Sequence, residues 1–182
     1  MKRESIISLV NGFVLMIFLV GFYFHVFSIH FVFSYSWHKV LHILGVVLFF
    51  GNMVVGPVWV SYAFFSQDEK ILDFSLKVLR KTDISLTIFG LDLLVINGLI
   101  LSSAFGDWKN QEWIFYSVIL LAFMWVLSLP VVYIQEKLFE AFEREGSRSI
   151  EFLKYLKLWA VFGTITTIPP SIIFYLMIAK NI

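Results

Sequence analysis

Residues 38–65 read HKVLHILGVVLFFGNMVVGPVWVSYAFF, and this stretch decides the fold class. It contains no Asp, Glu, Lys or Arg after Lys39. A helix needs roughly 20 apolar residues to cross a hydrocarbon core about 30 Å thick. The run is continuous and lacks the period-two alternation of membrane β-strands, so a helix is favoured over a barrel strand. The stretch therefore predicts a transmembrane helix.

Four other stretches have the same character, at residues 5–31, 84–103, 113–135 and 158–179. The first follows Met1-Lys2-Arg3, as a signal peptide would. Its apolar run is too long for one, however, and no small-residue cleavage site follows, so we expect it to be retained. The sequence predicts an all-α, polytopic membrane helical bundle with five transmembrane helices in a single domain, residues 1–182.

Composition excludes several classes of protein. Of 182 residues, 59% are hydrophobic and 15% charged, against about 45–50% and roughly 25% in an average soluble domain. The net charge of +1 argues against a nucleic-acid partner. The chain has no cysteine, which excludes disulfides and thiolate metal sites. We find no glycine-rich phosphate loop, HExxH helix or GxSxG elbow, so no reaction is assigned.

Lys and Arg are distributed unevenly between the two sides. Three of the 14 (Lys39, Lys109 and Lys180) lie on one side, and the other 11 lie before the first span or in the second-to-third and fourth-to-fifth connections. The positive-inside rule then predicts a cytoplasmic N-terminus and an external C-terminus. We expect residues 136–157 to extend the fourth helix, to break at Gly146-Ser147 and to lead into the fifth.

All four histidines (His25, His30, His38 and His42) fall at the predicted outer end of the first two spans. His38 and His42 share a helix face. At about 1.5 Å per residue, His25 and His42 lie roughly 6–8 Å below the outer boundary, on neighbouring helices. Such imidazoles can hold haem or a metal ion. We take His42 and His25 as candidate haem ligands, and His38 and His42 as candidate metal ligands; the alternative is interfacial or hydrogen-bonded histidines without a ligand.

Three polar residues at membrane depth are also candidates, because such residues are costly unless they are paired or functional. Asn52 lies on a stripe that we expect to face the bundle interior, made of His38, His42, Gly45, Phe49, Asn52 and Gly56. Asn52 and Asp92 fall at similar depths, roughly 8–12 Å from the inner boundary, and would bond if their helices touch. Asp92 is either a proton carrier or a neutral hydrogen-bonded group. Asn97 lies nearer the histidines, on the opposite face of the third span from Asp92.

The second span also carries a resemblance. Residues 37–45 (WHKVLHILG) with Phe50-Gly51-Asn52 resemble the W-x-K-x-LH-x-x-G…G opening of an uncharacterised bacterial family of predicted integral membrane proteins. Residues 125–135 (WVLSLPVVYIQ) are similar to that family's Trp-x-x-x-x-Pro-Val-x-x-x-Gln helix end, and residues 158–180 also fit. The resemblance covers residues 37–180 and implies the cytoplasmic (inner) membrane of a bacterium.

That family in turn looks distantly similar to copper-resistance D proteins and to haem-binding, four-helix protoporphyrinogen oxidases. Those proteins open a span with Lys-x-Leu-His, and the resemblance maps their haem-binding histidine onto His42. Residues 107–113 contain Lys109 without the His-x-Lys pattern of the oxidases. This departure argues against porphyrinogen oxidation and leaves haem binding open.

Three functions follow as hypotheses. The first is a haem-binding, redox-type membrane protein with its ligand near the outer face. The second is a copper-handling or transport protein, with Asn52 and Asp92 as an inner polar station; the five methionines show no paired spacing that would favour a high-capacity copper path. The third is a structural or assembly subunit. The expected surroundings are the lipid bilayer, with a membrane redox partner or a second copy of the chain.

Overall fold

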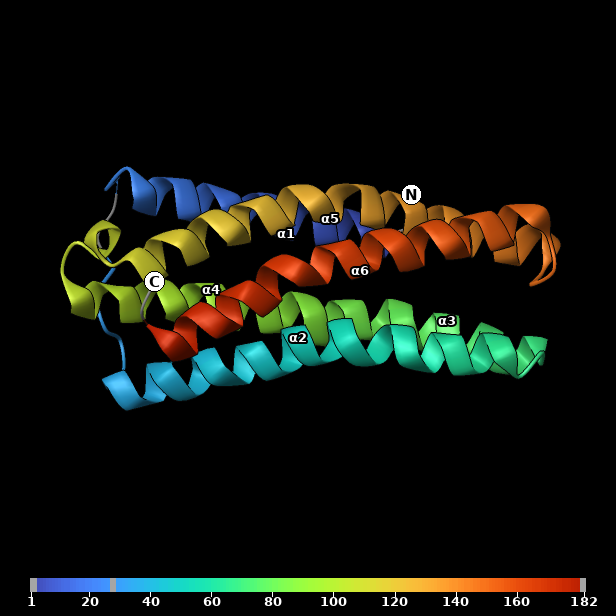
Figure 1. The fold of residues 1–182 in the computed structure, drawn as a ribbon, viewed down its shortest axis with the longest axis horizontal. Coiled ribbons are helices and arrows are strands. Elements are labelled where there is room, and N and C mark those ends of the chain that lie inside the picture. The colour runs from blue at the N-terminus through green and yellow to red at the C-terminus, as the bar shows by residue number, and fades with distance from the viewer. Residues whose placement is uncertain (1–2, 27–28, 181–182) are drawn as a thin grey trace.

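The computed structural model describes residues 3–26 and 29–180, and this part of the chain is helical throughout apart from its connections (Figure 1). The elements are α1 (Arg3–Tyr23), α2 (Tyr35–Phe65), α3 (Glu69–Thr82), the π-helix η1 (Asp83–Ile88), α4 (Phe89–Ser102), the short 3₁₀ helices η2 (Ser103–Phe105) and η3 (Trp108–Asn110), α5 (Glu112–Glu145) and α6 (Ile150–Ala179).

Two long helical hairpins and one further helix make up the bundle. In the first hairpin, α2 packs along the continuous helical segment α3–η1–α4. In the second, α5 packs along α6. Helix α1 lies against α5 and also contacts η1 and α4. Figure 1 shows the first hairpin along one side of the molecule, with α1 and α5 along the other.

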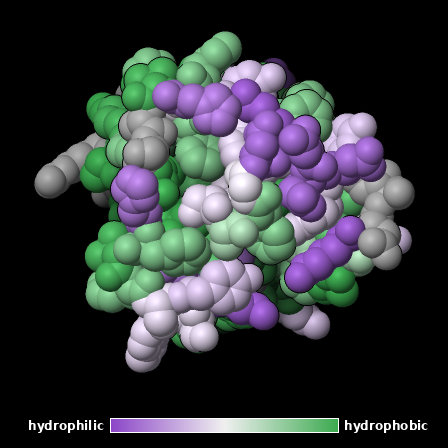
Figure 2. Space-filling view, turned by 90° about the vertical axis from the view of Figure 1, so that its left-hand side faces the viewer, coloured by the Kyte–Doolittle hydropathy of each residue, from purple (hydrophilic) through white to green (hydrophobic). Residues whose placement is uncertain are grey.

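The two ends of the bundle differ. We call the end that carries the α2–α3 and α5–α6 turns the basic end, and the opposite end, with the α1–α2 and α4–α5 connections and the C-terminus, the histidine end (Figure 1). Figure 2 looks onto the histidine end, where hydrophilic side chains gather on the end face and hydrophobic ones occupy much of its edge. The charge rule predicts that the basic end is cytoplasmic.

Five helical segments are long and apolar enough to cross a membrane, beginning at Ser5, Tyr35, Glu69, Glu112 and Ile150. Many large apolar side chains on them are exposed, among them Val47, Val126 and Tyr175. In a water-soluble monomer such a surface would be abnormal, whereas lipid covers it without cost. The predicted polytopic helical bundle is therefore confirmed.

Two predicted boundaries are wrong. The first helix ends at Tyr23 and not near residue 31, because the chain turns at Phe24–Val26 with His25 in a left-handed backbone conformation (φ 55°). The third helix begins at Glu69 and not near residue 84. Asp68 caps the start of α3 by accepting hydrogen bonds from the backbone N–H groups of Lys70 and Ile71. One face of α3 is then buried although its other face is charged.

The predicted extension of the fourth helix is confirmed. Helix α5 continues to Glu145, beyond the predicted end of the fourth span at residue 135, and stops at Gly146, which has a φ of 79°. Ser149 then caps α6 by accepting a hydrogen bond from the backbone N–H of Phe152 at 3.1 Å. The two hairpins consequently extend beyond α1 at the basic end.

Two apolar clusters hold the bundle, one toward each end. The cluster at the basic end joins α2, α3, α5 and α6, and includes Leu72, Leu138 and Phe152. The cluster at the histidine end joins α1, α4, η3 and α5, and includes Leu19 and Trp108. The cavity described next shares Leu79, Phe139 and Trp159 with the cluster at the basic end.

Candidate functional site: a polar chamber toward the basic end

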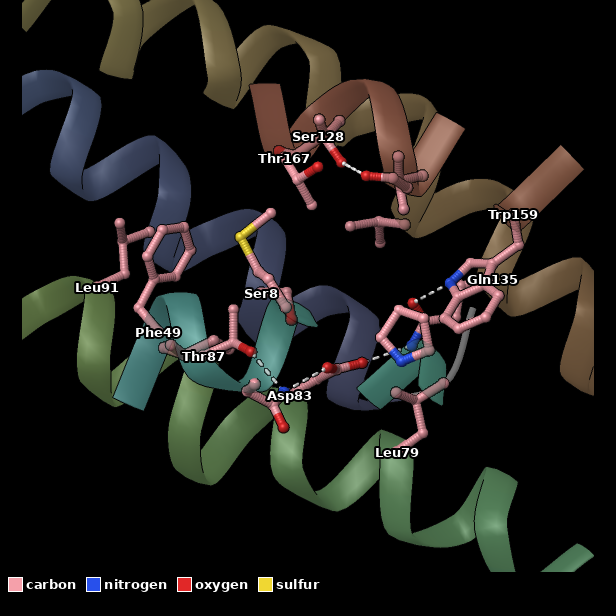
Figure 3. A pocket seen from close by; sticks show the side chains of 18 of the residues that line it. Ser8, Phe49, Leu79, Asp83, Thr87, Leu91, Ser128, Gln135, Trp159 and Thr167 are labelled. Carbon is pink, nitrogen blue, oxygen red and sulfur yellow. Dashed lines mark hydrogen bonds between the residues drawn. The ribbon is translucent and has the colours of Figure 1, made fainter. Parts of the chain in front are cut away.

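A cavity of about 580 Å³ lies between α1, α2, the α3–η1–α4 segment, α5 and α6. Figure 3 shows its walls, where polar side chains from several helices point inward among apolar ones. The polar lining residues include Ser5, Ser8, Asn11, Asn52, Ser61, Arg80, Asp83, Thr87, Ser128, Gln135, Trp159, Thr164, Thr166 and Thr167. We call this cavity the chamber.

Asp83 is the centre of a hydrogen-bonded chain that crosses the chamber wall (Figure 3). Its carboxylate accepts from Asn52 Nδ2 on α2 at 3.2 Å and from Gln135 Nε2 on α5 at 2.5 Å. Gln135 Oε1 accepts in turn from Trp159 Nε1 on α6 at 3.1 Å. Asn52 Nδ2 also donates to Thr87 Oγ1 at 2.8 Å. The chain thus connects α2, η1, α5 and α6.

Local backbone geometry sets the position of Asp83. It begins the π-helical segment η1, whose wider turn carries both Asp83 and Thr87 opposite Asn52. Single π-turns inside α-helices are rare and occur frequently at functional sites. On the facing helix, the predicted interior stripe is confirmed, since Gly45, Phe49, Asn52 and Gly56 are all buried.

Asn52 has one polar atom that the protein leaves unsatisfied. Its side chain is 6% exposed, and its Oδ1 is buried without a hydrogen-bond partner. Both hydrogens of its amide are used, by Asp83 and by Thr87. A buried acceptor without a donor costs about 1–3 kcal/mol, and native proteins contain few of them.

The expected bond between Asn52 and Asp92 is not formed. Asp92 Oδ1 instead accepts from Asn11 Nδ2 on α1 at 2.9 Å, while Asn52 pairs with Asp83 and Thr87. Asp92 lies nine residues beyond Asp83 on the same continuous helix and faces α1, outside the chamber lining. Asp83 is therefore the acidic side chain of the chamber.

His38 is held in the bundle by both ring nitrogens. It is 2% exposed, and its Nε2 accepts from the backbone N–H of Phe33 at 3.1 Å. Nδ1 must then carry the proton, and it donates to Asn97 Oδ1 at 2.8 Å. The prediction that Asn97 lies at the level of the histidines is confirmed. A metal ion could take His38 only by displacing one of these two hydrogen bonds.

His42 and His25 occupy different settings. His42 Nδ1 donates to the backbone carbonyl of Leu94 at 2.8 Å, and its ring lies against Gly98. Its Nε2 is the ring atom that remains for a ligand. His25 is exposed in the turn after α1, outside the helix that was expected to carry it. Among the described residues, no three His, Asp or Glu side chains are grouped closely enough to hold a metal ion.

Residues 36–181 match the family model described as "Predicted integral membrane protein (DUF2269)". The chain belongs to this family. The match spans α2 to α6 and leaves α1 outside it. Comparison with curated proteins gives no match, and comparison with solved structures gives none either. The similarity to copper-resistance D proteins and to haem-binding oxidases stays a prediction.

The DUF2269 region supplies the whole hydrogen-bonded chain of the chamber. Reasoning from the sequence identified Asn52 but missed Asp83, Thr87, Gln135 and Trp159. One usable signal was the spacing of Asp83, Thr87 and Gly90, because steps of four and three place residues on one helix face. The nearby lysines and arginine obscured it by making residues 66–83 look like a solvated connection.

Proposed function

We propose that this DUF2269 protein is a bacterial inner-membrane protein of the transport class, which binds a small hydrogen-bond-donating cation in the chamber. An ammonium or short alkylammonium ion is the chemical class that fits. The observation that carries the proposal is the unsatisfied Oδ1 of Asn52 beside the Asp83 carboxylate in a cavity of about 580 Å³.

Two unsatisfied buried atoms belong to residues that line the chamber: Asn52 Oδ1, an acceptor without a donor, and Arg80 Nη2, a donor without an acceptor. The N–H groups of Asn52 and Trp159 already donate within the chain. Asn52 Oδ1 and the carboxylate oxygens of Asp83 are acceptors, and each oxygen has more than one lone pair. A ligand with N–H donors would therefore satisfy Asn52 Oδ1.

Charge and volume support the same class of ligand. The Arg80 guanidinium also lines the chamber, so a cationic donor would have to bind at the Asp83 carboxylate, which an opposite charge stabilises. Small-molecule sites generally have volumes of about 300–1,000 Å³. Apolar lining residues such as Phe49, Leu79 and Leu91 would accommodate a short alkyl group.

The test compares two cations that differ in their N–H groups. The thermal unfolding midpoint of the purified protein in detergent is measured in methylammonium chloride and in tetramethylammonium chloride. We expect methylammonium to raise the midpoint with concentration, as a ligand specific for the folded state does, and tetramethylammonium to leave it unchanged.

Two isosteric variants assign the effect to the chamber. Asp83→Asn should abolish the methylammonium shift. Asp92→Asn removes a carboxylate from the same continuous helix outside the chamber lining, and should retain the shift. An equal response to both cations would overturn the proposal, as would a shift that persists in Asp83→Asn.

A second candidate is haem ligation by His42, for which we infer a single protein ligand. Its support is the Nε2 atom of His42, which remains available because Nδ1 bonds Leu94. Haem iron is commonly held by one imidazole nitrogen. The test is the absorption spectrum of protein produced with supplied haem: we expect a Soret band that His42→Ala abolishes and Asn97→Ala retains. Absence of the band, or its persistence in His42→Ala, would refute this candidate.

A further inference from the structure

A second hollow, of about 340 Å³, lies between α3 and α5 next to the chamber and shares part of its lining. We call it the α3–α5 groove. Its apolar lining comes from Leu76, Ile84, Phe139 and Phe142, and its charged lining from Asp73, Lys77, Arg80, Lys81 and Glu143. The groove thus combines a hydrophobic floor with a charged rim, which are the two features of a phospholipid near its headgroup.

Arg80 is the residue that makes this groove unusual. Its guanidinium carbon lies 4.2 Å from the centroid of the Phe139 ring, which fixes the side chain over the floor of the groove. Its Nη2 is buried and has no hydrogen-bond partner. An unsatisfied N–H group of this kind costs about 1–3 kcal/mol, more when it is charged. Guanidinium groups match the geometry of phosphate oxygens particularly well.

The charged side chains of the groove carry a net positive charge. Lys77 is paired with Asp73 at 2.5 Å, so these two charges largely cancel. Lys81 is exposed, and within the described residues its ammonium group has no ion-pair partner. Glu143 also lines the groove, so the three basic and two acidic side chains of the lining leave one net positive charge for an anion.

The height of the groove in the bilayer selects the kind of anion. Helix α1, with 21 residues, is about as long as the hydrocarbon core is thick, so its start marks the membrane boundary. Ser5 near that start donates to Glu136 on α5 at 2.5 Å. Phe139 lies three residues further along α5, about 4.5 Å beyond the boundary. Arg80, over Phe139, consequently lies at the level of lipid phosphates.

We propose that the α3–α5 groove binds the phosphate of an anionic phospholipid from the cytoplasmic leaflet, with Arg80 and Lys81 as the phosphate-binding residues. Basic pockets between helices on this side of a membrane suit anionic headgroups. The phosphate pairs with the charges of Arg80 and Lys81, and an acyl chain covers the apolar floor. The groove shares Arg80, Ile84 and Phe139 with the lining of the chamber, so Arg80 belongs to both sites.

The test is native mass spectrometry of protein released from nanodiscs made of equal parts phosphatidylcholine and phosphatidylglycerol. We expect the wild-type protein to retain one phosphatidylglycerol in preference to phosphatidylcholine. Arg80→Gln should lose this preference. Lys81→Gln, at an exposed position, should weaken it without disturbing folding and serves as the second variant if Arg80→Gln does not fold.

The matched control is Lys70→Gln, which removes an exposed lysine from the same helix, α3, outside the groove. It should retain the lipid as well as the wild type does. Equal loss in Lys70→Gln would mean non-specific attraction to the basic end and would overturn the proposal, as would a wild-type protein without a preference. Displacement of the lipid by inorganic phosphate at low concentration would identify a site for soluble anions and would overturn the assignment to lipid.

Discussion

Replacement of Gly45 by alanine should destabilise the protein strongly, because α2 and α4 touch backbone to backbone at this residue. A Cβ atom built on Gly45 would lie 2.5 Å from the backbone nitrogen of Leu94 and 2.7 Å from the carbonyl oxygen of Gly90. Gly90 meets α2 equally closely, with a built Cβ 2.6 Å from the backbone nitrogen of Phe49. Small residues permit this kind of close approach between membrane helices.

The expected loss of stability follows from how far α2 and α4 must separate to admit the alanine side chain. Ordinary contacts of a Cβ atom begin at 3.4 Å, so α2 and α4 would have to separate by close to 1 Å. Overpacking a well-packed interior costs typically 1–3 kcal/mol, and the upper end applies because the obstructing atoms are backbone. The better helix propensity of alanine returns about 1 kcal/mol. We expect Gly45→Ala to lower the free energy of unfolding by about 2 kcal/mol.

Gly51→Ala is the matched control. Gly51 lies on the same helix, and a Cβ built on it meets no atom within 4 Å. This variant should be as stable as the wild type or up to about 1 kcal/mol more stable. The assay is denaturant unfolding in mixed micelles, followed by circular dichroism. If Gly45→Ala proves as stable as Gly51→Ala, the close crossing of α2 and α4 is refuted.

Three further predictions concern buried contacts. His38→Ala should lower the free energy of unfolding by about 2–4 kcal/mol, because it leaves a cavity and removes the donor to the buried Asn97 Oδ1. In the same unfolding assay, the double variant with Asn97→Ala should lose less than the sum of the two single variants. Strict additivity would contradict the hydrogen bond between His38 and Asn97. Phe152→Ala should cost about 3–5 kcal/mol, since Phe152 is 0% exposed, and a cost below about 1 kcal/mol would show that the basic-end cluster does not stabilise the bundle. Asn11→Ala should cost about 1–3 kcal/mol by leaving Asp92 Oδ1 without its donor; the thermal midpoint measures this loss, and an unchanged midpoint would refute the bond between α1 and α4.

The long apolar runs predicted the bundle because hydrophobic length is a local property of the sequence. The interior stripe of α2 was also predictable, since small and polar residues at helical spacing indicate a buried face. Helix α3 was not predicted as part of the third span, because its charges lower the mean hydropathy of the segment. The apolar positions Leu72, Leu76 and Leu79, spaced by four and three, predict a half-buried helix and were the better guide.

The partners of the polar residues could not be predicted from depth alone. Asn52 and Asp92 were estimated to lie at similar depths, yet they bond to different helices. Depth along a helix follows from residue count, whereas the direction in which a side chain points also depends on how each helix is rotated. The π-helical turn at Asp83 changes that rotation locally, and the sequence carries no clear mark of it. Residue count also misplaced one of the four histidines, because His25 lies beyond the end of the helix that was expected to carry it.

Helix α1 and the rest of the bundle contribute different parts of the chamber. Asn52, Asp83, Gln135 and Trp159 all lie within the DUF2269 match, so the hydrogen-bonded chain is complete without α1. The outer half of α1 is fixed in the apolar cluster at the histidine end, whereas its inner half lines the chamber with polar residues (Ser5, Ser8 and Asn11). Lipid chains in that place would offer no hydrogen-bond donor to the acceptors of the chamber. A polar helix face lies there instead, and the apolar cluster at the basic end joins the other four helical segments.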